Sequence, residues 1–381
     1  MRKYTSFLLA LLCLLLIGSC QKESIAPTAE VVDETQFLQL NTIEDLERFE
    51  KEWQANTGTS RHSNFGKTII LKANSNNALQ DAVNAAGRFG RVILEKGNHI
   101  QETTVTISHP VFIIGEEGAR LTTNVPAQIG QGVIHTAFHI YKGNRVVIWG
   151  LEMINRVEGG AAFIIEDAQR AVIAKTNMYN YQTGVIIQQG DKSLIWKNNI
   201  QLTPKSLAFE FFVAYGIVNI NGDAVKITAN KVTNGVFGIW ACDKNGEARF
   251  NETFNNFIGF ILCNVPPNDI ALESGSAVGG SEEPGNRWQV TNNHSHDNFD
   301  AGYLVVDGAN NNFLIDNRGG NNGTFDIDLT TDTERFGFPV PGSFENFVDA
   351  GSFDNISIKD CGENNLVIGG QQVDTSIDAC F

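Results

Sequence analysis

The densest group of proton-transfer side chains lies in the segment NNHSHDNFD, residues 292–300. It contains His294, His296, Asp297 and Asp300. If the segment is a strand, the two histidines lie on the same face, because side chains alternate along a strand. Two imidazoles on one face suit proton transfer or metal ligation. A polar corner between strands is the alternative. If the protein is a catalyst, we expect these four residues to carry the reaction.

A second group of carboxylates lies in FDIDL, residues 325–329, where Asp326 and Asp328 alternate with apolar residues. Side chains two apart on a strand are about 6.5–7 Å apart, a spacing compatible with the acid and base of an inverting glycosidase. With Asp332 and Glu334, the pair also suits Ca²⁺, which prefers oxygen ligands. The segment lacks the glycine turn of a compact calcium loop. Catalysis, calcium binding and plain solvated acids all remain open.

Basic residues for an acidic ligand are sparse. Lys226 alternates with apolar neighbours and is expected to point outward, and Lys244 and Arg249 follow about one repeat later. We predict that these three residues help to bind substrate, with a solvated surface as the alternative.

The positions of these residues are determined by a repeat. Four residues return after an interval of 21: Asn230 as Asn251, Asn234 as Asn255, Gly238 as Gly259 and Cys242 as Cys263. A fixed period indicates a solenoid, and a repeat rich in Asn and Gly is a poor helix sequence. The remaining architecture is a parallel β-solenoid, in which residues one turn apart stack about 4.7–4.9 Å apart. We expect the corner asparagines to adopt left-handed dihedrals and to stack their amides.

The segment ALQDAVNAAGRFGRVILEKGNHIQETTVTISHPVFIIGEEGARL resembles the opening of right-handed parallel β-helix proteins of the pectate-lyase-like superfamily. In that superfamily a capping helix leads into the first strand. The turn Gly97-Asn98-His99 departs from the family pattern, because histidine replaces the aromatic residue. The resemblance covers residues 66–381. It implies an all-β, right-handed parallel β-helix with an N-terminal capping helix.

The same resemblance leaves the activity open, since the superfamily includes lyases, hydrolases, epimerases and non-catalytic members. Its lyases use a base and a cation, often Ca²⁺ or Arg/Lys, so Ca²⁺ is the cofactor that the resemblance implies. The Gly-His-Gly and Arg-Ile-Lys segments of the polygalacturonases have no counterpart here. The pair His296-Asp297 matches only part of the Asp-Pro-His-Asp motif of mannuronan epimerases.

The amino terminus, MRKYTSFLLALLCLLLIGSC, has the basic start and short apolar run of an export signal. Its end resembles the lipobox of bacterial lipoproteins, which implies cleavage before Cys20 and acylation of the Cys20 thiol. An ordinary signal peptide is the alternative. The predicted organisation is a signal at 1–19, a tether at 20–40, a helical lead-in at 41–65 and the β-helix at 66–381.

Four cysteines follow Cys20, an even number in an exported chain. We expect Cys361 and Cys380 to form a disulfide. Cys242 and Cys263 fall on consecutive turns and form either a second disulfide or a buried pair of reduced thiols.

Three insertions interrupt the period: residues 203–215, which include Phe211 and Phe212, residues 265–286 and residues 330–352. They either wall a groove, where Phe211 and Phe212 would bind substrate, or shield the solenoid.

The formal net charge of −15 argues against a nucleic-acid partner. We expect a monomeric, lipid-anchored protein of the cell envelope, held on the outer membrane and facing the periplasm or the outside. The first hypothesis is that it binds or processes an extended, uronate-type polysaccharide. The second is a non-catalytic scaffold that engages a protein partner. A cluster of Lys or Arg with His or carboxylate would favour the first.

Overall fold

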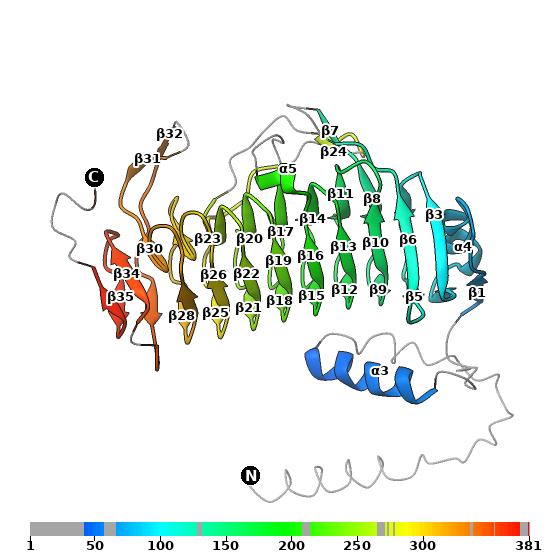
Figure 1. The fold of residues 1–381 in the computed structure, drawn as a ribbon, viewed down its shortest axis with the longest axis horizontal. Coiled ribbons are helices and arrows are strands. Elements are labelled where there is room, and N and C mark those ends of the chain that lie inside the picture. Colours follow the sequence, from blue (N-terminus) through cyan, green and yellow to red (C-terminus); the bar gives the residue numbers. More distant parts are fainter. Residues whose placement is uncertain are drawn as a thin grey trace, which may run out of the picture.

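The structure is a computed structural model in which the chain winds into one long coil of stacked, parallel strands (Figure 1). It describes residues 42–56, 66–127, 132–207, 214–264, 271–272, 274–276, 279–335, 338–353, 355–373 and Cys380, with the backbone alone for 52–56, 271, 333–335 and 338–339. Three long sheets form the sides of the coil. The fold class expected from the sequence, a right-handed parallel β-helix, is confirmed.

Sheet A has 12 strands. They are β1 (Thr68–Leu71), β2 (Gly90–Leu94), β5 (Val111–Gly115), β9 (Val147–Trp149), β12 (Val172–Ala174), β15 (Leu194–Trp196), β18 (Lys226–Thr228), β21 (Glu247–Arg249), β25 (Gln289–Thr291), β28 (Phe313–Ile315), β33 (Phe347–Asp349) and β35 (Leu366–Ile368).

Sheet B has nine strands and sheet C has 11. Sheet B contains β3 (Gly97–Gln101), β6 (Ala119–Thr123), β10 (Glu152–Asn155), β13 (Asn177–Tyr179), β16 (Asn199–Gln201), β19 (Lys231–Thr233), β22 (Glu252–Phe254), β26 (His294–His296) and β29 (Arg318–Gly320). Sheet C contains β4 (Val105–Ile107), β8 (Thr136–Tyr141), β11 (Ala161–Glu166), β14 (Thr183–Gln188), β17 (Tyr215–Asn219), β20 (Phe237–Ala241), β23 (Ile258–Leu262), β27 (Tyr303–Val305), β30 (Ile327–Leu329), β34 (Ser357–Asp360) and β36 (Gln371–Gln372).

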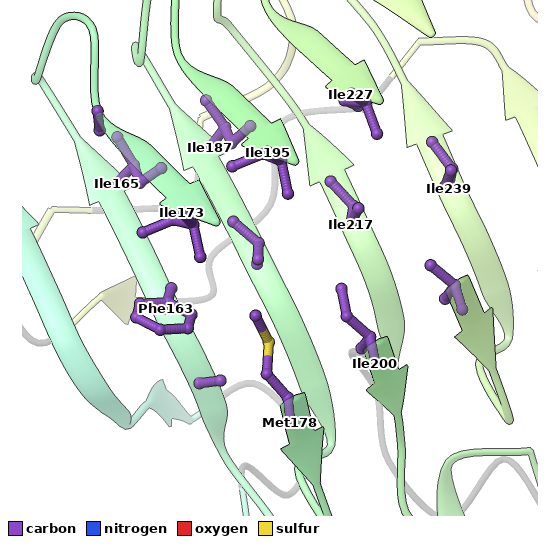
Figure 2. Packing of buried hydrophobic residues seen from close by; sticks show 14 of the residues in the cluster. Phe163, Ile165, Ile173, Met178, Ile187, Ile195, Ile200, Ile217, Ile227 and Ile239 are labelled. Atoms are coloured by element: carbon purple, nitrogen blue, oxygen red, sulfur yellow. The ribbon is translucent and has the colours of Figure 1, made fainter. Parts of the chain in front are cut away.

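The core lies inside the coil, where the sheets contribute rows of aliphatic side chains (Figure 2). In sheet A, Ile173, Ile195 and Ile227 stack in register on three successive turns. In sheet B, Met178 pairs with Ile200 in the same way. The short strands bury every second residue against these rows, which leaves the alternate residues on the outer faces.

The interval of 21 residues corresponds to one turn of the coil, as expected. Gly238 lies beside Gly259 on paired strands β20 and β23, and a Cβ on Gly238 would come 2.4 Å from the carbonyl oxygen of Gly259. Asn234 and Asn255 have φ of 69° and 52° and are also adjacent, because the Asn234 N–H donates to the Asn255 carbonyl oxygen at 3.2 Å. These two asparagines adopt the predicted left-handed corner.

Asn230 and Asn251 stack their amides but are not the left-handed residues of their corner. The Asn251 side-chain oxygen accepts from both the main-chain N–H and the side-chain amide of Asn230, at 2.9 and 3.0 Å. The positive φ falls one residue earlier, at Ala229 and Phe250. Here the preceding residue makes the bend, and asparagine is needed to satisfy buried main-chain groups.

This pattern extends into three buried asparagine ladders, in which each amide oxygen accepts from the asparagine of the preceding turn. The ladders are Asn198–Asn230–Asn251–Asn293–Asn317, Asn256–Asn298–Asn322 and Asn312–Asn346–Asn365.

Two helices cover the amino-terminal part. Helix α4 (Leu79–Ala86) packs Leu79 and Val83 into the open end of the core and ends at Gly87, where φ is 68°. It is the capping helix that the sequence predicts. Helix α3 (Ile43–Asn56) places Leu46 on the outer face of sheet A, against a cluster that includes Trp149 and Trp196. A third helix, α5 (Pro204–Leu207), has one turn. Among the described residues, none of the helices has the length and apolar character needed to span a bilayer.

The outer face of sheet C carries a buried apolar cluster. Its cluster includes Ile186, Trp240 and Ile261, and residues from two insertions pack against it, Leu272 and Val340. Leu272 belongs to β24 (Ala271–Leu272), which pairs with β7 (Val133–Ile134). Val340 belongs to β32 (Phe338–Val340), which forms a hairpin with β31 (Thr333–Arg335). In their described parts, these insertions shield the solenoid.

The disulfide between Cys361 and Cys380 is present, with the Cα atoms 5.6 Å apart. Cys242 and Cys263 are reduced and buried, as in the second of the two arrangements considered. The Trp240 indole N–H donates to the Cys263 sulfur at 2.8 Å. Burial raises the pKa of the Cys242 thiol well above its ordinary value, so it remains a thiol.

Candidate functional site

The outer face of sheet B carries the predicted histidine pair. In β10 and the three-residue strands the first and third residues point outward, and in β3 and β6 the second and fourth residues do. Strand pairing aligns the outward residues into two rows. The first row is Arg120, Glu152, Asn177, Asn199, Lys231, Glu252, His294 and Arg318, and the second is Thr122, Ile154, Tyr179, Gln201, Thr233, Phe254, His296 and Gly320.

The two histidines of β26 lie side by side on this face, as the sequence predicts. Their ring centroids are 4.2 Å apart. Glu252, on the neighbouring strand β22, completes a group of three in which one ligand atom from each residue lies within 4.8 Å of the other two. We call these three residues the His–Glu cluster.

His296 is held from three sides. Its Nδ1 lies 2.6 Å from Asp297 Oδ2, and its Nε2 lies 3.3 Å from Glu252 Oε1. Its ring stacks on Phe254 with a centroid distance of 5.4 Å and an interplanar angle of 5°. Asp297 is a left-handed corner residue with φ of 53°, and its carboxylate contacts the imidazole of the preceding residue. The imidazole therefore has a defined orientation although 19% of its side chain is exposed.

Two cations flank the cluster. Lys231 Nζ lies 3.1 Å from Glu252 Oε2 and 4.6 Å from the centroid of the Phe254 ring. Arg318 pairs in register with His294 on the next turn. Cations and carboxylates thus alternate around the histidine pair on this face.

The charges of the cluster influence one another. Burial lowers the pKa of His294, and the nearby His296 and Arg318 lower it further. Burial alone would raise the pKa of Glu252, but hydrogen bonds from Lys231 and His296 bring it below the ordinary value. The hydrogen bond from His296 lowers the pKa of Asp297. Near neutral pH the site thus combines ionised carboxylates with a neutral His294. It can transfer a proton, bind an anion or ligate a metal ion.

Asp300, the fourth residue of the predicted group, makes a different contact. It lies at the corner that leads into β27, where its Oδ1 accepts from the Thr324 hydroxyl at 3.0 Å.

The expectation that Asp326 and Asp328 share a face is wrong. Asp328 is on the outer side of β30, 3.7 Å from Lys359 Nζ, because its neighbours Ile327 and Leu329 fill the core. Asp326 precedes the strand and turns inward, where a Cβ on Gly319 would lie 2.3 Å from its carboxyl carbon.

Inside the coil the Asp326 carboxylate accepts from the N–H and hydroxyl of Ser357, both at 2.9 Å, and from the Asn322 amide at 2.8 Å. This pair cannot act as two outward acids or coordinate one calcium ion. Asp332 is exposed and accepts from the Gly342 N–H at 2.6 Å. The side chain of Glu334 lies outside the described residues.

The three predicted substrate-binding cations lie away from this face. Lys226 and Arg249 are on sheet A and contact Glu247, at 3.9 and 2.9 Å respectively. Lys244 lies at a corner and contacts Glu283 at 3.1 Å. The inserted Phe211 and Phe212 are outside the described residues.

Sequence reasoning missed Lys231, Glu252, Phe254 and Arg318. A signal for three of them exists, because each asparagine of the longest ladder is followed directly by a residue of the first row. Asn230, Asn251, Asn293 and Asn317 precede Lys231, Glu252, His294 and Arg318. Aligning the repeats on the ladder would have brought these side chains together.

Comparison with known proteins identifies the fold and nothing finer. No protein-family model and no curated protein matches the chain. Among solved structures, the Streptococcus pneumoniae surface protein and adhesin PfbA is similar, with a TM-score of 0.54 and 12% identity, over 79% of this chain and 97% of that chain. A polygalacturonase from Erwinia carotovora ssp. carotovora has a TM-score of 0.52 and 13% identity, over 81% of this chain and 95% of that chain. The chain thus has the parallel β-helix fold that these proteins share.

Proposed function

We propose that the outer face of sheet B binds an extended, uronate-type polysaccharide, and that the His–Glu cluster is the centre at which the ligand is held or processed. The observation that carries the proposal is the placement of Lys231 and Arg318 on either side of a cluster that contains two histidines and a carboxylate. On the described outer face of sheet B, these groups fall on four consecutive strands.

The chemistry of the face matches such a ligand. Lysine and arginine neutralise sugar carboxylates through charge-assisted hydrogen bonds. The aromatic side chain of Tyr179, in the second row, offers a surface on which a sugar ring can pack. The rows run straight along the coil, so a linear chain can meet successive turns at a constant spacing. In the metal-free protein His296, oriented by Asp297, is the group we propose for proton transfer to or from the bound sugar.

The polygalacturonase among the similar folds supports a polysaccharide ligand, and the adhesin supports a place at the cell surface. We further propose that the chain is a lipoprotein monomer whose residues 1–19 direct export and whose Cys20 carries the anchor, on the outer membrane. If so, Cys20→Ala moves the protein from the membrane fraction to the soluble fraction.

The test uses residues 21–381 and a panel of uronate polysaccharides, with and without Ca²⁺. Binding is measured by calorimetry, lyase products by the absorbance of unsaturated sugars, and hydrolysis by reducing ends. We expect Lys231→Ala and Arg318→Ala each to weaken binding by roughly 10- to 150-fold, since a charged hydrogen bond contributes about 1.5–3 kcal/mol.

Lys226→Ala is the matched control, because Lys226 is also a strand lysine paired with glutamate but lies on sheet A. Equal losses in all three variants, or no binding by the parent protein, would refute the proposed ligand and favour the scaffold with a protein partner. His296→Ala is expected to abolish any activity that the panel reveals; full retention would exclude the cluster as its site.

A further inference from the structure

The His–Glu cluster has a second property that does not depend on a polysaccharide. Two imidazoles and one carboxylate on adjacent strands offer three ligand atoms to one point in space. The strands are parallel and hydrogen-bonded through register pairs Glu252 with His294 and Phe254 with His296. The main chain therefore holds the three side chains on a rigid surface.

The separations suit a tetrahedral metal centre. Ligands about 2.0–2.1 Å from Zn²⁺ at tetrahedral angles lie about 3.3 Å from one another. His296 Nε2 and Glu252 Oε1 are 3.3 Å apart, and all three ligand atoms lie within 4.8 Å of each other. Ligation of a metal ion requires the three ligand atoms to move closer together than in this structure.

The surroundings provide the orienting contact that metal-binding histidines usually have. Asp297 Oδ2 accepts from Nδ1 of His296 at 2.6 Å, which fixes the ring with Nε2 toward Glu252. A metal ion would replace the proton through which Nε2 hydrogen-bonds to Glu252 in the metal-free protein. The two oxygens of Glu252 also have different partners. Oε2 pairs with Lys231 at 3.1 Å, whereas Oε1 faces His296. One oxygen is thus left for a metal without breaking the ion pair.

We propose that Glu252, His294 and His296 bind one divalent transition-metal ion of the Zn²⁺ class, with Asp297 as the positioning residue and a fourth coordination position open to water or a ligand oxygen. The donor set selects the metal. Imidazole nitrogens suit Zn²⁺ and its neighbours, whereas Ca²⁺ takes oxygen ligands in larger number. The cluster is accessible to solvent, because Glu252 is 38% exposed.

The experiment titrates ZnCl₂ into metal-free residues 21–381 by calorimetry at pH 7.5, with Co²⁺ absorbance as a second readout of coordination. We expect one ion per chain. His296→Ala, His294→Ala and Glu252→Gln should each weaken binding at least 100-fold, and Asp297→Asn should weaken it about 10–100-fold. Affinity should fall as the pH drops below about 6, because protonated imidazoles cannot ligate a metal.

His135→Ala is the matched control. It removes another imidazole of intermediate exposure that lies outside the cluster, next to β8. Thermal melts of the metal-free variants show whether each remains folded. Zinc binding that is equally strong in folded His296→Ala, or equally weakened by His135→Ala, would overturn the proposal. Loss of polysaccharide binding with intact zinc binding would refute only the proposed function, and the reverse would refute only the metal site.

Discussion

Replacement of Asn251 by alanine tests the physical basis of the coil. Asn251 is 1% exposed and lies in the middle of the longest asparagine ladder. Its side-chain oxygen accepts from the N–H and amide of Asn230, and its own amide donates to the Ile227 carbonyl at 2.8 Å and to Asn293 Oδ1 at 2.9 Å. Alanine removes all four hydrogen bonds and leaves four buried polar groups with one partner fewer.

The expected loss in the free energy of unfolding depends on which hydrogen bonds the four groups keep in the variant. The Asn230 amide keeps its bond to the Ile195 carbonyl, and Asn293 Oδ1 still accepts from the Asn251 main chain, so each loses about 0.5–1 kcal/mol. The Asn230 N–H and the Ile227 carbonyl lose a buried bond at about 1–2 kcal/mol each. The sum is roughly 3–6 kcal/mol. For a β-helix of roughly 300 residues, 1 kcal/mol corresponds to about 1.5 °C in Tm, which predicts a fall of about 5–9 °C.

Differential scanning calorimetry at neutral pH measures this shift. Asn199→Ala is the control, because Asn199 lies on the outer face of sheet B and makes a long contact of 3.4 Å to the Tyr179 hydroxyl; its Tm should change by about 1 °C or less. If Asn251→Ala melts within about 1 °C of Asn199→Ala, the ladder does not stabilise the coil and the reasoning fails.

Two further predictions concern pH. Burial alone would raise the pKa of Glu166, but its hydrogen bonds with buried His139 and with Ser276 and Ser274 lower it overall. Its stabilisation is therefore present above the ordinary carboxyl pKa and lost as pH falls through the lowered value, so Glu166→Gln should flatten the acid limb of Tm against pH; an unchanged limb would contradict this. Burial raises the pKa of Asp243 to about 6. Above that pH the folded protein holds a buried negative charge, which lowers its stability relative to the unfolded state. The destabilisation develops as the pH rises from the ordinary carboxyl pKa of 3.8 to about 6, so Asp243→Asn should raise Tm at pH 8 and have little effect at pH 3. Equal effects at both pH values would refute the assignment.

Only part of the candidate site could be predicted from the sequence. His294, His296 and Asp297 could be predicted because they are neighbours in the chain, and their shared face follows from strand alternation. Glu252 is 42 residues before His294, twice the basic interval. The insertion that contains β24 occupies the extra length, so the two residues lie on adjacent strands. A pattern of short-range spacing cannot show that contact.

Asp326 and Asp328, before and within β30, show a second limit of prediction from the sequence. Alternation correctly places Asp328 on the outer side, but Asp326 belongs to a corner, where the bend of the chain and the missing side chain of Gly319 allow it to enter the coil. Its partners come from a residue 31 positions later, Ser357.

By itself, the sequence determined that the chain winds with a period of 21, that asparagine stacks on asparagine and that a helix caps the first turn. When identical residues stack on successive turns, they recur at a fixed interval in the sequence, so the repeat can be recognised without the structure. The tertiary structure alone decided which charged side chains meet on the outer face of sheet B. Which side chains meet depends on the length of each insertion and corner. These lengths change the spacing between the residues in the sequence, but they do not change which strands pair.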